Sequence, residues 1–299
     1  MNATVKLLNR ILVGTDFSPA GHLAVSRAGQ LASRHGSDLY LVQATPDWSL
    51  FSRWTSARRQ HYDEISLHAQ SAMRGEVNRI LSVFGVHAHG DVELGKASEA
   101  ITRTIASYEP ALVVVGARGE HEPRIAPAAL GGTSLKLLLR MACPLLLVRQ
   151  GDSQPWRTSL AAVHEASELS RRVVLWGSAL IPGGDCHIVH AYDAPYSERI
   201  RLCGTSDDVV EACSLAEEGV ARESLDNLLA AAAPDSHAHL HLVHGNPLGV
   251  LVTEIARHGP QLVAIGRQEI ERGQSPRESL GTMALRLAYH TPVDVLVVP

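Results

Sequence analysis

The sequence is poor in cysteine, in aromatic residues and in clusters of basic residues. Aromatic residues make up 4% of the 299 residues, and the charge balance of 27 basic against 31 acidic residues gives a net charge of -4. Such a chain offers no positive field for a phosphate backbone, so we expect no nucleic-acid partner. The few cysteines form no CxxC pair, which excludes a zinc ribbon and a disulfide framework and favours small buried thiols: Cys143, Cys186, Cys203 and Cys213.

Long apolar runs are also missing. The uninterrupted apolar runs, such as Leu112–Val115 and Leu145–Val148, are far shorter than the roughly 18 residues that span a bilayer. The segment Met1–Arg10 lacks the apolar region and the cleavage site of a secretory signal. We therefore expect a cytoplasmic protein with no membrane partner.

What the sequence does contain is an internal repeat. With 45% hydrophobic residues there is enough apolar material for a folded protein, and the length suggests two domains at about 150 residues each. Ala111–Arg118 reappears as Gln261–Gln268, 150 positions later. The joint is predicted in the polar segment Gln150–Pro155, which divides the chain into domains 1–150 and 151–299.

Each half alternates short apolar runs with longer amphipathic stretches. Continuous Val and Leu runs, in place of strict alternation, indicate parallel strands that are covered on both faces. The predicted fold is therefore α/β, with two tandem, doubly wound, five-stranded parallel sheets. In the first half the predicted strands are 10–15, 38–44, 86–94, 112–115 and 145–148, and in the second 159–163, 187–191, 239–244, 262–265 and 295–298.

Candidate binding residues follow the first and fourth strands of the first half. In an open parallel sheet, ligands bind beyond the carboxyl ends of the strands, where the strand order reverses. Glycines and the amides at a helix N-terminus suit a phosphate, and Asp16 suits a ribose hydroxyl or a base amine. Two alternatives stay open. In one, Gly116 and Gly119 serve only to reverse the chain. In the other, Asp16 only faces the macrodipole of the helix that begins at Ser18-Pro19.

These residues carry a resemblance to a known family. Ile11–Pro19, Val113–Gly119, Gly132-Thr133 and Cys143–Val148 resemble the corresponding motifs of universal stress proteins, and the whole chain resembles the tandem members of that family. The resemblance implies an adenine nucleotide alpha hydrolase-like fold with strand order 3-2-1-4-5 in each half. It also implies that the two halves of one chain form an intramolecular pseudo-dimer. The whole chain is then expected to be a monomer or a homodimer, and to have protein partners.

Family members that bind ATP share the pattern G-x2-G-x9-G-(S/T). Asp16, Gly116 and Gly119 match, but twelve residues separate Gly119 from Gly132, and eleven separate it from Gly131, where the pattern has nine. No basic cluster is visible in the sequence, so backbone amides alone are expected to hold the phosphates. The resemblance implies ATP or AMP as cofactor, bound by Thr15, Asp16, Gly116, Gly119, Gly131, Gly132, Thr133 and Ser134.

The second half departs further from the family pattern. His164 stands at the position of Asp16, and Glu269 replaces the glycine at the position of Gly119. A carboxylate there fills space and repels phosphates, so we expect the second half to act as a scaffold. His164 and His190 are interpreted as substitutions in a degenerate pocket.

Two functional hypotheses follow. The first is a stress-response signalling module that binds ATP or AMP through its first half. It has no predicted catalytic residue and at most slow ATP hydrolysis. The alternative is a dimer-like interaction scaffold that binds no nucleotide, which the lengthened glycine loop and the lost motif of the second half favour.

Histidine is enriched, at 16 residues. His237, His239 and His241 alternate and so project from one face of a strand, and His87 and His89 form the matching pair in the first half. Imidazoles bind zinc or copper, but a site also needs ligands that converge from elsewhere. We therefore expect a solvated strand face and no metal site.

Overall fold

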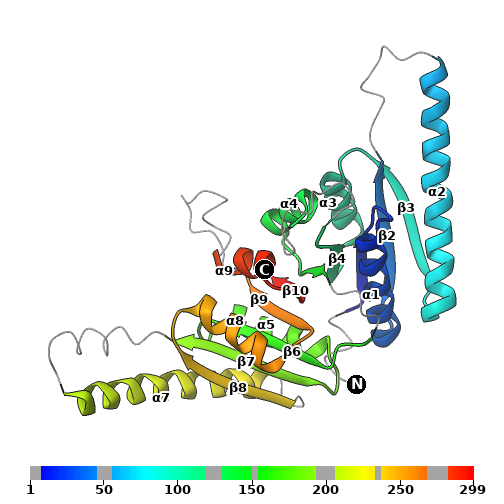
Figure 1. The fold of residues 1–299 in the computed structure, drawn as a ribbon. Helices are drawn as coiled ribbons and strands as arrows, with labels where there is room; N and C mark the ends of the chain where they lie inside the picture. Colours follow the sequence, from blue (N-terminus) through cyan, green and yellow to red (C-terminus); the bar gives the residue numbers. More distant parts are fainter. Residues whose placement is uncertain are drawn as a thin grey trace. The chain divides into compact units, whose positions relative to one another are not determined.

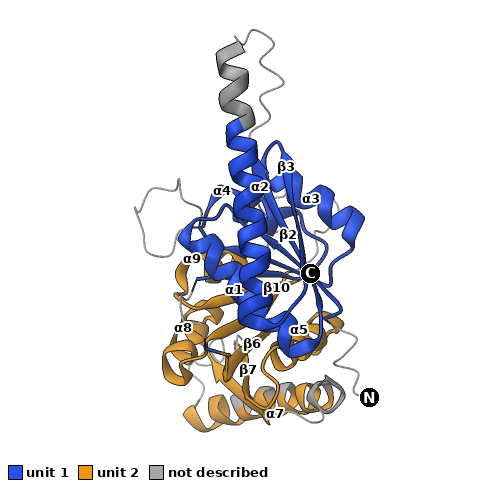
Figure 2. Ribbon diagram, turned by 90° about the vertical axis from the view of Figure 1, so that its right-hand side faces the viewer, with its two compact units in different colours: residues 1–154 blue, residues 155–299 orange. Residues whose placement is uncertain are grey.

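The computed structural model describes residues 8–45, 56–118, 130–149, 154–192, 206–232, 237–267 and 282–299. The chain divides into two compact units, residues 1–154 and 155–299 (Figure 2). Each unit contributes five parallel strands with helices packed against them, so the predicted α/β class is confirmed.

The first unit has the strand order β3-β2-β1-β4-β5, as the resemblance implied. The central strands β1 and β4 are almost completely buried, which explains their continuous apolar sequences. The elements of the unit are β1 (Arg10–Gly14), α1 (Pro19–His35), β2 (Asp38–Thr45), α2 (Ser56–Phe84), β3 (Ala88–Leu94), α3 (Ala97–Tyr108), β4 (Leu112–Gly116), α4 (Gly132–Arg140) and β5 (Leu145–Val148).

The second unit repeats this topology, with the order β8-β7-β6-β9-β10. The predicted element order is confirmed, although several boundaries differ from the prediction by a few residues. The elements are β6 (Thr158–Val163), α5 (Glu168–Ala179), β7 (Asp185–Tyr192), α7 (Asp207–Ala232), β8 (His237–His244), α8 (Pro247–His258), β9 (Leu262–Gly266), α9 (Thr282–His290) and β10 (Asp294–Val298).

Helices cover both faces of each sheet (Figure 1). In the first unit α1 packs against α2 on one face, and α3 packs against α4 on the other. The second unit repeats these pairs as α5 with α7 and α8 with α9. Among the helices that the structure describes, none is long and apolar enough to cross a membrane.

Local sequence signals explain where α1 begins and ends. The Ser18 hydroxyl accepts a hydrogen bond from the backbone N–H of Gly21 at 3.1 Å, and Pro19 occupies the first helical position. Gly36 ends the helix in the left-handed conformation, with φ of 64°, which glycine adopts without strain. The helix therefore starts directly after the loop that follows β1, and this start fixes the position of that loop.

Candidate functional site

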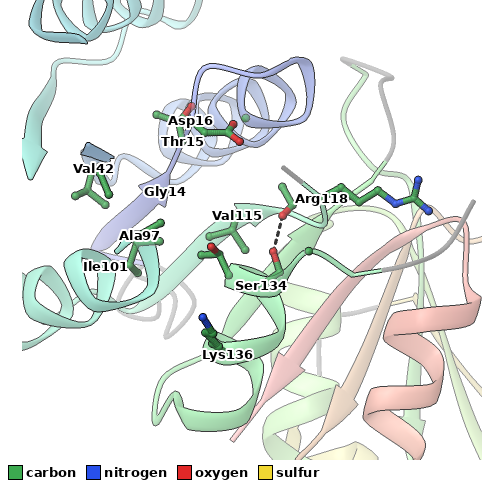
Figure 3. A pocket seen from close by; sticks show the side chains of 16 residues that line it. Gly14, Thr15, Asp16, Val42, Ala97, Ile101, Val115, Arg118, Ser134 and Lys136 are labelled. Carbon is green, nitrogen blue, oxygen red and sulfur yellow. Dashed lines mark hydrogen bonds between the residues drawn. The ribbon is translucent and has the colours of Figure 1, made fainter. Parts of the chain in front are cut away.

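A cavity of about 330 Å³ lies at the carboxyl ends of β1 and β4 in the first unit (Figure 3). These adjacent strands lead to helices on opposite faces of the sheet, which makes this the predicted ligand position. The volume is at the lower end of the range for small-molecule sites. The lining residues are Gly14, Thr15, Asp16, Gly21, Val42, Ala44, Ala97, Ile101, Val115, Gly116, Arg118, Gly131, Gly132, Thr133, Ser134 and Lys136.

The cavity brings together seven of the eight residues predicted to bind the nucleotide. Two come from the loop after β1, one from the end of β4 and four from the start of α4. The eighth, Gly119, lies outside the described residues, as does Glu269 of the second unit.

The loop after β1 is held by its own polar side chains. The Thr15 hydroxyl accepts a hydrogen bond from the backbone N–H of Phe17 at 3.0 Å. The Asp16 carboxylate accepts one from the N–H of Ser18 at 3.1 Å and one from the Ser18 hydroxyl. Thr15 is buried and Asp16 is exposed, so the Thr15 hydroxyl is enclosed while the Asp16 carboxylate stays accessible at the cavity.

The start of α4 is fastened to the end of β4. The N–H of Gly131 donates to the carbonyl of Ala117 at 2.8 Å, and the Ser134 hydroxyl donates to the carbonyl of Gly116 at 2.8 Å. Gly131 is the N-cap and has no side chain that could accept a hydrogen bond from the first turn of α4. The N-terminus of α4 lies at the cavity wall, and the N-terminus of a helix favours an anion.

Gly116 has a packing role of its own. A Cβ atom at this position would lie 2.9 Å from the carbonyl oxygen of Ala20, in the first turn of α1. Gly266, at the end of β9, has the same role, since its Cβ would lie 2.7 Å from Cγ of Leu169. The glycine that repeats in both halves therefore lets a helix approach the end of a strand closely.

Sequence reasoning missed two basic residues at the cavity, Arg118 and Lys136. Figure 3 shows Lys136 on α4 beside Ser134, whereas the Arg118 side chain extends away from the β1 loop. The spacing of Lys136 was a usable signal, because it follows Thr133 by three positions and residues so spaced share a helix face. The sequence prediction considered backbone amides alone at this place, and the structure adds the Lys136 side chain to the lining of the cavity.

His164 and His190, the two histidines that the sequence suggested as substitutions in a degenerate pocket, differ in burial. His190 is buried, and its Nδ1 lies 3.2 Å from the carbonyl oxygen of Val163. Burial lowers the pKa of His190, so the ring is neutral and serves as a hydrogen-bonded core residue. His164 is exposed after β6. Both line a separate cavity of about 490 Å³ whose wall on α7 includes Val220 and Leu225.

The comparison with protein families gives one model that matches twice. The model for the universal stress protein family matches residues 8–149 and 157–299, which together span most of the chain. The chain matches no curated protein sequence.

Solved structures share the fold over the whole chain. A universal stress protein from Archaeoglobus fulgidus superposes with a TM-score of 0.64 at 17% identity, covering 97% of this chain and 98% of that one. A functionally unknown protein from Pseudomonas aeruginosa gives 0.67 at 18% identity, with coverages of 100% and 94%. A structure described as a universal stress protein in complex with cAMP matches 47% of this chain and 96% of its own, at 20% identity and a TM-score of 0.36.

Proposed function

Because the chain belongs to the universal stress protein family, we propose that it is a cytoplasmic stress-response module whose first unit binds ATP or AMP. The observation that supports this most is the cavity at the carboxyl ends of β1 and β4, which is lined both by the loop after β1 and by the start of α4. Two segments more than 100 residues apart in the sequence meet there, at the point where parallel sheets bind nucleotides.

The two ends of the cavity suit the two ends of a nucleotide. At one end the Asp16 carboxylate can accept hydrogen bonds from a ribose hydroxyl or from the adenine amine. At the other end the amides of Thr133 and Ser134 open the helix, and the ammonium of Lys136 adds a full positive charge. The apolar side chains of Val42 and Ile101 line the space between and can contact a base or a sugar.

The second unit serves as a scaffold in this proposal. It keeps the fold and the packing glycine Gly266, but it has His164 where the first unit has Asp16. A neutral or protonated imidazole cannot accept two hydrogen bonds as a carboxylate does. The nucleotide is therefore assigned to the first unit, with one molecule per chain.

Isothermal titration of the full-length protein with ATP and with AMP tests the proposal. We expect one nucleotide per chain, at least a tenfold loss of affinity in Asp16→Ala, and unchanged affinity in the matched variant His164→Ala. Absence of binding of both nucleotides at millimolar concentration would overturn the proposal and leave the interaction scaffold as the better hypothesis. Equal losses in both variants would contradict the assignment to the first unit.

A further inference from the structure

Three histidines from distant parts of the sequence meet in the second unit. His187 lies on β7, His241 on the neighbouring strand β8, and His258 is the last residue of α8, which packs against β7 (Figure 1). One ring nitrogen from each lies within 4.8 Å of the others. All three residues are half-buried, so the cluster is sheltered and still reachable from solvent.

The rings face one another closely. Nδ1 of His187 lies 3.0 Å from Nε2 of His241. The His258 ring stacks on the His187 ring with 3.9 Å between centroids, and it lies 4.6 Å from the His241 ring. In a tetrahedral zinc site with bonds of 2.0–2.1 Å, ligand nitrogens are about 3.3 Å apart, so His187 and His241 are already close to that separation.

We propose that His187, His241 and His258 bind a zinc ion, each through one ring nitrogen. Three imidazoles are a donor set that zinc accepts, and the half-buried setting leaves a fourth position for water or for an oxygen ligand. This site lies in the unit that the proposed function treats as a scaffold, and it is independent of nucleotide binding.

Glu254 supplies the support that metal-binding histidines require. Its Oε2 lies 3.0 Å from Nε2 of His258, one helical turn further along α8, and its side chain is only 1% exposed. The other oxygen pairs with Arg257 at 2.9 Å. A carboxylate that accepts the Nε2 proton fixes the ring of His258 and leaves Nδ1 as the ligand atom.

A fourth histidine and a carboxylate lie beside the cluster. His239 lies on the exposed side of the cluster, with its ring 5.4 Å from that of His187 and its Nε2 3.8 Å from Asp185.

The first unit shows that the fold does not require histidines at these three positions. Tyr40 pairs with His89 across β2 and β3 as His187 pairs with His239 across β7 and β8, which places Tyr40 at the position of His187. By the same register Asp91 is at the position of His241, and Tyr108 ends α3 as His258 ends α8.

The first unit fills this place with different chemistry. The Tyr40 hydroxyl donates to the Asp91 carboxylate, and the Tyr40 and Tyr108 rings lie 5.0 Å apart. A phenol and a carboxylate satisfy each other's hydrogen-bonding needs without a metal, whereas three imidazoles satisfy one another's only in part. The two units therefore keep one packing position and differ in their affinity for a metal.

Zinc titration of the full-length protein, stripped of metal with EDTA, tests the proposal. We expect one zinc per chain with a dissociation constant below the micromolar range, by calorimetry and by metal analysis after dialysis. Cobalt in place of zinc is expected to give the intense visible absorption bands of a tetrahedral site, a signature that adventitious surface binding does not produce.

Replacing a ligand histidine by the residue at the equivalent position of the first unit removes the ligand and is expected to keep the packing. His187→Tyr and His258→Tyr are each expected to lower zinc affinity at least a hundredfold, and the matched exposed control His237→Ala should leave it unchanged. Glu254→Gln, which keeps the shape of the positioning residue, should lower affinity about 10- to 100-fold and shift the cobalt spectrum.

Two results overturn the proposal. One is absence of stoichiometric zinc binding by the wild-type protein together with no tetrahedral cobalt spectrum, a measurement that needs no variant to fold. The other is unchanged zinc binding in His187→Tyr and His258→Tyr when circular dichroism shows both variants folded. Neither result bears on nucleotide binding, because the Asp16 cavity lies in the other unit.

Discussion

The Ser134 hydroxyl donates a 2.8 Å hydrogen bond to the carbonyl of Gly116 and so ties the first turn of α4 to the end of β4. Ser134 is only 3% exposed, and a hydroxyl has a single proton to donate. That proton is used within the protein, so in the proposed nucleotide site Ser134 would act only by holding the helix in position. Thr133, which is half-exposed at the same cavity, is better placed for direct contact.

Substitutions at these neighbouring residues separate the two roles. Ser134→Ala removes a buried hydrogen bond and leaves the Gly116 carbonyl without its donor, so the free energy of unfolding should fall by about 1–2 kcal/mol. Thr133→Val should leave stability nearly unchanged and lower ATP affinity. Urea denaturation and calorimetry on both variants measure this difference, and a larger stability loss in Thr133→Val would contradict it.

A methyl group at Gly116 should destabilise the first unit. The Cβ of Gly116→Ala would lie 2.9 Å from the backbone oxygen of Ala20, and backbone cannot move aside as a flexible side chain does. We expect a loss of about 1–3 kcal/mol in urea denaturation. The control is Gly75→Ala in α2, where no atom lies within 4 Å of the added Cβ. Since alanine favours helix, that variant should gain about 0.5–1 kcal/mol.

The fold was predictable from the sequence because the same pattern of apolar runs occurs in both halves, so each half supports the interpretation of the other. Leu112–Val115 and Leu262–Ile265 each read as a buried parallel strand, and the same element order surrounds both. Periodicity located the elements but not their ends. β8 begins at His237, two residues before the prediction, because pairing with Asp185 on β7 extends the strand.

The candidate sites were harder to predict, since topology brings their residues together. His241 was recognised as one of three alternating histidines, but its neighbour His187 is 54 positions away in the sequence and comes from another strand. The expected solvated face holds for His237 and His239, which are exposed, whereas His241 is half-buried and contacts His258 of α8. Lys136 was overlooked for a related reason, because a single lysine forms no cluster in the sequence.

Lys136 should contribute to nucleotide affinity through charge. Lys136→Gln is expected to weaken ATP binding several-fold and AMP binding less, because ATP carries more phosphate charge near the ammonium. The loss should shrink as salt is raised, since ions screen the attraction. Arg140→Gln is the matched control, because Arg140 is exposed on the same helix and is not among the residues that line the cavity. Equal effects of the two variants on ATP affinity would exclude a local role for Lys136.

The stability of the first unit should depend on pH through Glu76, a buried carboxylate on α2. Burial by itself would raise the pKa of Glu76, but hydrogen bonds from Arg79 at 2.7 Å and from His22 outweigh it, and the net pKa is lowered. Because the folded pKa lies below the unfolded value of about 4.3, the unfolded chain binds more protons in this range. The stabilisation is therefore present above pH 4.3 and is lost as the pH falls through the folded pKa.

Glu76→Gln tests this directly. At pH 7 the variant should be about 1–2 kcal/mol less stable than the wild-type protein, because a neutral amide binds Arg79 more weakly than a carboxylate does. Below pH 4 the difference should narrow, since the wild-type carboxyl group is then protonated as well. Urea denaturation between pH 3 and pH 7 measures both effects. The exposed Glu99→Gln is the control, and stability curves of Glu76→Gln and wild type that run parallel over this range would show that Glu76 does not carry the pH dependence.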